Sequence, residues 1–270
     1  MRGIKQKYDQ WAFVFFKIDK ITDQFKIVID TKNTKMKRKP GKFIVISIAI
    51  FCSFFTSCSS QSQPTFRTFY KPIIFDSQRI QLSLEYLKNR YGIIQDAPSI
   101  KPIMIVLHWT AIPTLEKTFD VFNRSTLPNA RKGIQYASTL NVSSQYLVDR
   151  DGTIFQLMPD TLFARHVIGL NYCAIGVENV GSEKAPLTEA QLNANVQLIR
   201  YLKDKYPIQY VIGHYEYKQF IGTPLWKETD PNYLTEKTDP GVVFMKKIRE
   251  RIKDLHLKGA PEKNKIASKF

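Results

Sequence analysis

The feature that most constrains the fold of this chain is a pair of short apolar segments, each followed by a histidine. Residues 103–107 read IMIVL and precede His108, and residues 210–213 read YVIG and precede His214. The IMIVL segment does not alternate apolar and polar residues, which is typical of a strand that is buried on both faces. Strands of this kind need helices on both sides of a sheet, so the pair predicts an α/β fold.

Helix-like and strand-like segments alternate along the rest of the chain. Residues 76–91 have apolar side chains at helical spacing behind two capping residues. The dipeptide Asp151-Gly152 indicates a hairpin turn inside residues 144–156. We also expect a strand at 174–180, a helix opened by a capping box from Thr188 to Gln191, and a final helix at 243–255. Together these elements predict a single domain with a mixed central β-sheet flanked by helices.

Composition and charge indicate which kinds of molecule the protein is expected to bind. Hydrophobic residues make up 43% of the 270 residues, which is enough to bury a core. The net charge is +16, but residues 1–57 contain 12 Lys and Arg against 4 Asp and Glu, so half of the excess lies there. The chain contains no recognisable motif that reads nucleic acid, and we expect no nucleic-acid partner. We expect the protein to be a monomer. Cys173 is the only cysteine after Cys58, so we expect no disulfide framework in the main domain.

The segment that starts at Met36 has the pattern of an export signal. Four cations precede the apolar run 43–55, which has 13 residues. A membrane-spanning helix needs about 20 residues, whereas a run of this length is typical of a signal peptide. Phe-Thr-Ser-Cys at 55–58 resembles a bacterial lipobox, with Phe55 where an aliphatic residue is usual. The resemblance implies that Cys58 carries a lipid.

Other interpretations of the front of the chain stay open. The signal could be cleaved without lipidation, and the apolar run could be a buried core segment. Translation could start at Met36, or residues 1–35 could be a genuine extension. We divide the chain into an N-terminal extension and lipoprotein signal peptide at 1–57, a tether at 58–70, a main domain at 71–257 and a basic tail at 258–270.

Histidines are the first candidates for metal ligands. The chain has four, and His108 and His214 both follow strands whose ends should meet at the rim of the sheet. A catalytic zinc site needs three protein ligands and an open fourth position. Asp239, in the segment KTDPG at 237–241, is a possible third ligand. The same position also fits a helix cap with Pro240 as the first helical residue, and spacing alone does not decide between them.

Five blocks in sequence order resemble the zinc N-acetylmuramoyl-L-alanine amidases of the amidase-2 and peptidoglycan recognition protein superfamily. They are VLHWTA, YLVDRDGTIFQLMP, AIGVENVG, IGHYE and KTDPG, between about Ile103 and Gly241. The resemblance implies Zn²⁺ held by His108, His214 and Asp239. It further implies Glu178 and Lys237 as catalytic residues and His166 as a substrate contact.

Two features depart from the family pattern or compete with it. Ser144-Gln145 stands where members commonly have an aromatic residue or histidine, which puts a detail of substrate binding in doubt. Residues 215–236 form a longer segment than in compact members and could be a groove wall or a lid. That segment contains a competing Asp230-Pro231, but Asp230 lacks both the lysine two residues ahead and the following glycine. We therefore prefer Asp239.

The resemblance implies a peptidoglycan hydrolase that cuts the amide bond between N-acetylmuramic acid and L-alanine of the stem peptide. Zinc would lower the pKa of a water molecule to about 7, Glu178 would accept its proton, and Lys237 would stabilise the oxyanion. The alternative is a peptidoglycan-binding protein of the same fold without activity. We expect peptidoglycan or muropeptides as partners, and a lipid anchor in the cell envelope, in the outer membrane facing the periplasm.

Overall fold

The computed structural model describes residues 67–128 and 132–262. The predicted extension, the signal peptide and the lipidation site Cys58 lie outside these residues. In the part of the chain that is described, no helix combines the length and the apolar character needed to cross a membrane.

The described residues contain one sheet of six strands in the order β1-β4-β3-β5-β2-β6. β3 and β4 form the predicted hairpin and run antiparallel, and the other neighbouring pairs run parallel, so the sheet is mixed as predicted. The strands are β1 (Thr68–Tyr70), β2 (Met104–Trp109), β3 (Tyr146–Val148), β4 (Ile154–Gln156), β5 (Ala174–Asn179) and β6 (Tyr210–Gly213).

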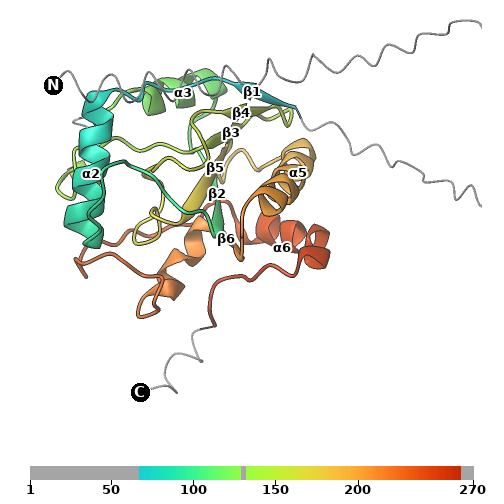
Figure 1. Cartoon of the computed structure of the whole chain (residues 1–270). Coiled ribbons are helices and arrows are strands. Elements are labelled where there is room, and N and C mark those ends of the chain that lie inside the picture. The colour runs from blue at the N-terminus through green and yellow to red at the C-terminus, as the bar shows by residue number, and fades with distance from the viewer. Residues whose placement is uncertain (1–66, 129–131, 263–270) are drawn as a thin grey trace, which may run out of the picture. The chain divides into compact units, whose positions relative to one another are not determined.

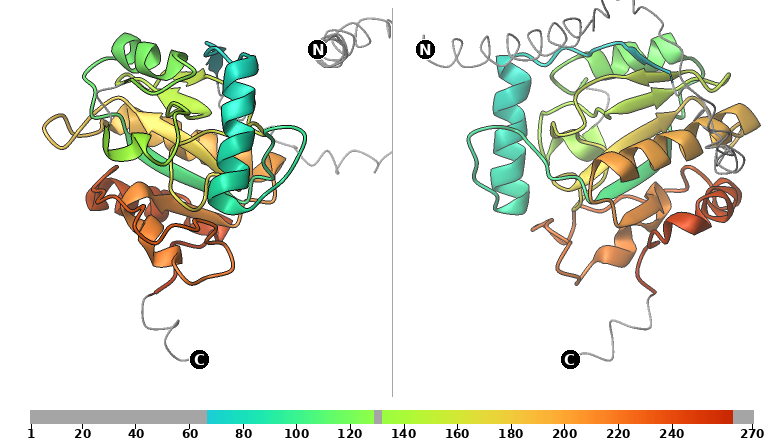
Figure 2. Two further views of the ribbon diagram at one scale, coloured as in Figure 1. Left: turned by 90° about the vertical axis from the view of Figure 1, so that its left-hand side faces the viewer. Right: turned by 45° about the vertical axis from the view of Figure 1, so that its right-hand side comes forward.

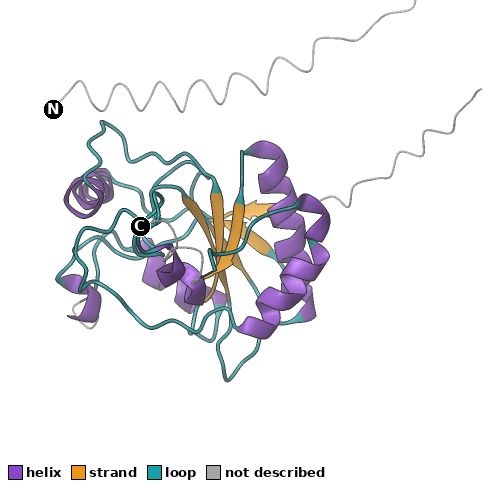
Figure 3. Cartoon of the chain, turned by 90° about the horizontal axis from the view of Figure 1, so that it is seen from below, coloured by secondary structure: helices purple, strands orange, loops and turns teal. Residues whose placement is uncertain are grey.

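Helices lie on both sides of this sheet. Figure 1 shows α5 and α6 on one side and α2 on the other, and the views in Figures 2 and 3 agree. The α-helices are α2 (Ser77–Tyr91), α3 (Leu115–Asn123), α4 (Lys132–Gln135), α5 (Glu189–Lys205) and α6 (Val242–Arg251), with 3-10 helices η1 (His214–Phe220) and η2 (Lys253–Leu255).

β2 lies in the middle of the core and divides it into two apolar layers. Ile105 and Leu107 pack in the cluster that contains the buried residues of α5 and α6. Met104 and Val106 point to the opposite face, into the cluster that contains residues of α2. All four side chains are buried, which confirms that the IMIVL segment is a strand covered on both faces.

Capping residues fix the start of the two long helices as the sequence predicts. The side chain of Asp76 accepts a hydrogen bond from the backbone N–H of Arg79 at the start of α2. Thr188 and Gln191 form the predicted capping box of α5. Satisfying these first N–H groups stabilises a helix start by about 1 kcal/mol.

Several features differ from the prediction at the edges of the domain. Residues 68–70, which fall in the predicted tether, form the edge strand β1 alongside β4. Lys258, in the predicted basic tail, accepts a backbone hydrogen bond from Val211 and so extends the opposite edge beside β6. α3 and α4 were not predicted. In α3 the spacing of Leu115, Phe119 and Phe122 does fit a helix capped by Thr114, so this signal was missed.

Candidate metal centre and adjoining pocket

Three neighbouring parallel strands present the candidate site at one edge of the sheet. His108 in β2 is paired in register with Glu178 in β5. On the other side of β2, Leu107 is paired with Gly213, the last residue of β6, so that His214 follows at the level of His108. Paired residues of parallel strands project from the same face, and strand ends hold side chains rigidly. The register therefore brings Glu178, His108 and His214 to one place.

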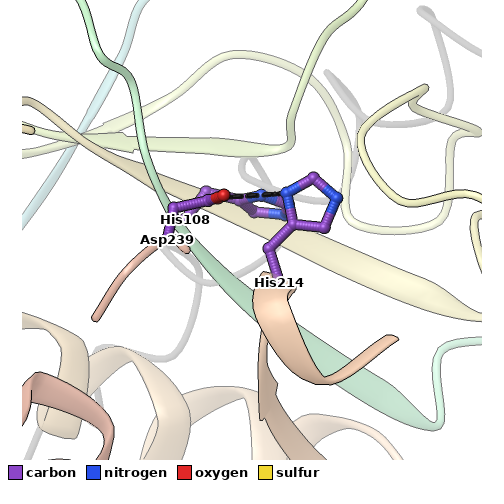
Figure 4. Close-up of side chains that lie close together, drawn as sticks. All are labelled: His108, His214 and Asp239. Carbon is purple, nitrogen blue, oxygen red and sulfur yellow. Dashed lines mark hydrogen bonds and ion pairs between the residues drawn. The ribbon is translucent and has the colours of Figure 1, made fainter. Parts of the chain in front are cut away.

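His108, His214 and Asp239 converge on a single point (Figure 4). His108 Nδ1 lies 2.9 Å from His214 Nδ1 and 3.1 Å from Asp239 Oδ2, and His214 Nδ1 lies 3.0 Å from the same oxygen. All three residues are buried. Zinc bonds of about 2.0–2.2 Å at tetrahedral angles place ligand atoms roughly 3.3 Å apart. The three residues could therefore hold a metal ion with little movement.

Asp239 reaches the histidines because the segment before α6 lies close to the end of β6. The backbone N–H of Tyr215 donates to the carbonyl of Asp239 at 3.0 Å. Gly213 makes this approach possible, because a Cβ there would lie 3.0 Å from the ring of Pro240. The N-cap of α6 is Gly241. The helix-cap interpretation of Asp239 is therefore wrong, and its side chain faces the histidines.

The competing acid lies elsewhere. Asp230 is 3.5 Å from the guanidinium of Arg90, and its other oxygen accepts from the backbone N–H of Asn232. It contributes nothing to the cluster of His108, His214 and Asp239.

A chain of hydrogen bonds assigns the proton of His108. His166 Nε2 lies 3.2 Å from the carbonyl oxygen of Ala174 and therefore donates to it. This leaves His166 Nδ1 as an acceptor for Nε2–H of His108, at 3.1 Å. His108 then keeps Nδ1 free of a proton and turned towards His214 and Asp239. Outer hydrogen bonds of this kind fix the tautomer of a metal-binding histidine.

The absence of a side chain at Gly176 gives the ring of His166 its place. Gly176 lies in β5 two residues before Glu178, on the same face of the sheet. A Cβ at this position would lie 2.8 Å from Cγ of His166. The sequence predicts His166 as a substrate contact, and the structure adds a hydrogen bond to His108 that sequence reasoning missed.

The surroundings of His214 and Asp239 favour the protonation states in which these residues can bind a metal ion. Burial, helped by the neighbouring His108, lowers the pKa of His214 to about 4. Burial alone would raise the pKa of Asp239, but the charge of His214, the hydrogen bond with His214 and the closeness of the His108 ring hold it well below its ordinary value. Near pH 7, His214 is therefore neutral and Asp239 ionised, which is the form that binds a metal.

The two predicted catalytic residues flank this centre. Glu178 is half-buried at the end of β5, in register with His108. Lys237 is exposed and lines a pocket together with His166 and His214. The other residues that line this pocket are Tyr86, Ile134, Val142, Arg165, Val167, Ile168, Asn171, Tyr233 and Thr235.

Buried amide side chains support the backbone of the first histidine. Asn179 in β5 donates to the carbonyl of His108 at 3.0 Å. Its own side-chain oxygen accepts from Asn195 of α5 at 2.6 Å. Asn179 directly follows Glu178, so one strand end presents the candidate base on one face and clamps β2 from the other. The only sequence signal for this clamp is a polar residue inside an apolar strand.

The segment 215–236 is held at several points by side-chain contacts. Glu228 forms an ion pair of 2.7 Å with Arg90 at the end of α2. The hydroxyl of Tyr217 accepts from the backbone N–H of Thr235 and donates to its carbonyl, both at 2.8 Å. Trp226 stacks on Tyr217. These contacts favour the groove wall over the lid among the two predicted roles.

The sequence pattern of one known protein family matches the part of the chain that contains this site. The pattern of the family described as N-acetylmuramoyl-L-alanine amidase (Amidase_2) matches residues 98–242, more than half of the chain. No curated protein matches the sequence at a significant level.

Solved structures with partial similarity to this chain include an amidase, an AmpD derivative and a peptidoglycan recognition protein. An N-acetylmuramoyl-L-alanine amidase, LysC from Clostridium intestinale URNW, is 20% identical, with 59% of this chain and 88% of that chain covered and a TM-score of 0.35. An AmpD derivative is 22% identical, with coverages of 68% and 93% and a TM-score of 0.43. Peptidoglycan recognition protein-LE in complex with tracheal cytotoxin is 14% identical, with coverages of 64% and 92% and a TM-score of 0.41.

The family match spans His108, Glu178, His214, Lys237 and Asp239, the residues that the structure gathers at the end of the sheet. The chain belongs to the N-acetylmuramoyl-L-alanine amidase family, Amidase_2.

Proposed function

We propose that the protein is a zinc-dependent peptidoglycan hydrolase that cleaves the amide bond between N-acetylmuramic acid and L-alanine of the stem peptide. One observation carries this proposal: the convergence of His108 Nδ1, His214 Nδ1 and Asp239 Oδ2 within about 3 Å, in register with Glu178. Two neutral imidazoles and one carboxylate form a ligand set that suits a catalytic zinc ion.

The three converging side chains are the proposed ligands of the zinc ion. His108, His214 and Asp239 would hold the ion. When bound, zinc would lower the pKa of a water molecule to about 7 and polarise the carbonyl of the substrate. The burial of the three ligands strengthens this effect, because water does not screen the charge.

Glu178 is the proposed general base and acid. Its place on the same face as His108 lets it accept the proton of the attacking water and later give that proton to the leaving amine of L-alanine. Lys237 is the proposed partner of the developing oxyanion, because it is a cation on the pocket wall that His214 also lines. His166, whose ring also lines this pocket, is proposed to contact the substrate.

Digestion of purified peptidoglycan tests the proposal. The zinc-loaded protein should release soluble peptides that begin with L-alanine, identified by mass spectrometry. Glu178→Gln should reduce this release by about 10²–10⁴-fold and retain the zinc, because Glu178 is a base and not a ligand. Glu183→Gln, at an exposed position in the following turn, is the matched control and should cleave normally.

The alternative is a peptidoglycan-binding protein without activity. If the zinc-loaded protein sediments with the polymer and releases no peptide, the alternative replaces the hydrolase.

We also propose a lipid anchor at Cys58, in the cell envelope and in the outer membrane facing the periplasm. The support is the cationic segment, the apolar run and the lipobox-like sequence that precede this cysteine. Mass spectrometry of the protein isolated from membranes should show a lipidated N-terminal Cys58. An N-terminus upstream of Cys58 would reject the anchor.

A further inference from the structure

The pocket beside the metal centre contains a buried cation that has no carboxylate partner among the described residues. Arg165 is 3% exposed and lines the pocket. Its two terminal nitrogens donate to the carbonyls of Ser138, Leu140 and Ile134 and to the hydroxyl of Tyr233. All four acceptors are neutral. Buried charges are usually paired, because an isolated one is costly to desolvate.

The same pocket is lined by hydroxyl groups that have protons to donate. The hydroxyl of Tyr233 accepts from Arg165 at 2.9 Å, so this bond does not use its own proton. The buried oxygens of Tyr86 and Thr235 make no hydrogen bond of normal length and angle among the described residues, although the Tyr86 hydroxyl lies near that of Tyr91. Burial raises the pKa of Tyr86 well above 10, so its hydroxyl stays protonated and remains a donor. Leaving such groups unpaired costs about 1–3 kcal/mol each.

The nearby acid is already engaged. Glu228 influences Tyr86 electrostatically, but its side chain is paired with Arg90 at 2.7 Å and accepts from the backbone N–H of Asp230 at 2.9 Å. Lys237 and the neutral His166 and His214 are the other titratable groups on the pocket wall. The pocket therefore offers positive charge and O–H donors, and no acid competes for them.

We infer that Tyr86, Tyr233 and Thr235, with Arg165 behind them, bind a carboxylate on the peptide side of the substrate. This inference rests on the proposed function. The lactyl carboxyl group of muramic acid is consumed in the amide bond that is cleaved, so the free carboxylates of the substrate belong to its peptide. Tyr86 lies in α2, upstream of the family match at 98–242, so this helix adds a residue of its own to the pocket.

Binding of two matched muramoyl tripeptides tests the inference. They differ only in the free carboxylates of the peptide, all of which are carboxamides in the second ligand. Dissociation constants are measured by calorimetry on the zinc-loaded Glu178→Gln protein, which does not consume the ligands. We expect the acid to bind at least about tenfold more tightly than the amide, as a charge-assisted hydrogen bond requires.

Conservative variants locate the effect. Tyr86→Phe and Thr235→Val, each added to Glu178→Gln, should reduce the preference for the acid, and the double change should bring it close to one. Tyr201→Phe, on the outer side of α5, is the matched control and should keep the full preference. Zinc content and thermal melting confirm that each variant is folded.

The outcomes separate this inference from the proposed function. Equal affinity for acid and amide, with normal cleavage by the unmodified protein, rejects the carboxylate subsite and leaves the hydrolase intact. A preference for the acid that survives in the double variant also rejects the subsite. Failure to bind or cleave either tripeptide rejects the proposed function and the subsite with it.

Discussion

His166 Nδ1 lies 3.1 Å from His108 Nε2, so one histidine orients the other. The bond leaves His108 Nδ1 free to face His214 and Asp239. It connects a residue of the pocket wall directly to the candidate metal centre.

Replacing His166 with alanine should weaken zinc affinity by about 10–100-fold, because the proton of His108 would no longer be held on Nε2. Competition with a chromogenic chelator measures the affinity. His256→Asn is the matched control, since this histidine is exposed and has a positive φ of 51° that asparagine tolerates. Unchanged zinc affinity in His166→Ala would show that the hydrogen bond does not support the centre.

Gly176→Ala should disturb the same hydrogen bond from the other side. The new Cβ would lie 2.8 Å from Cγ of His166 and must displace the ring. We expect a loss of about 1–3 kcal/mol in the free energy of unfolding, as for other overpacked cores, together with weaker zinc binding. Gly133→Ala, where no heavy atom lies within 4 Å, is the control. If both variants melt alike, the ring is not confined as described.

The stability of the metal-free protein should depend on pH. Burial holds the pKa of His166 well below 6.5 and that of His214 at about 4. Between pH 6.5 and pH 4 the unfolded chain therefore binds more protons than the folded one, so the stabilisation present above pH 6.5 is lost as the pH falls. Each histidine contributes up to about 1.4 kcal/mol per pH unit.

Urea unfolding of the chelator-treated protein at pH 7.5, 6.5 and 5.5 measures this slope. His214→Phe should make the slope shallower. A free energy of unfolding that stays constant over this range would contradict the protonation states assigned to His166 and His214.

Asp160 should be important for stability and irrelevant to zinc. It is 2% exposed and accepts hydrogen bonds from Tyr146, Gln156, Lys205 and Tyr206. Asp160→Ala leaves the buried Tyr146 hydroxyl without its acceptor, while the partly exposed Lys205 can turn to water, so the change should cost about 1–3 kcal/mol. Asp254→Ala, which breaks an exposed pair with Arg200, should change the melting temperature little. Loss of zinc in a folded Asp160→Ala protein would contradict this separation.

Much of the fold could be predicted because its signals are local. The apolar run before His108, the Asp151-Gly152 turn and the capping box at Thr188 each involve residues close in sequence, and the structure confirms all three. The short edge strand β1 was missed because its three residues are exposed and carry no periodic pattern.

The buried face of α2 shows where local reasoning fails. The spacing of Ile80 and Leu84 predicts that they face the core, but both are only half-buried. Arg79 is buried instead, because its guanidinium donates to the carbonyls of Phe122 and Arg124 at the end of α3. A contact across more than 40 positions leaves no trace in the helical pattern.

Some residues of the candidate site could also be predicted from local sequence, whereas others depend on contacts between distant segments. His108 and His214 could be identified from the strands that they follow. Asp239 could be distinguished from Asp230 only through the family resemblance, since its approach depends on the packing of Pro240 against Gly213. The bond from His166 to His108 depends on the register of β5, which the sequence alone does not determine.

The central claim is that His108, His214 and Asp239 form a zinc centre, and titration of the metal-free protein with zinc tests it most directly. We predict one tightly bound zinc ion per chain in the unmodified protein and in Asp230→Asn. We also predict that Asp239→Asn and His214→Ala, shown to be folded by circular dichroism, bind zinc far more weakly. No tight zinc in the unmodified protein, or equal zinc affinity in Asp239→Asn and Asp230→Asn, would contradict it.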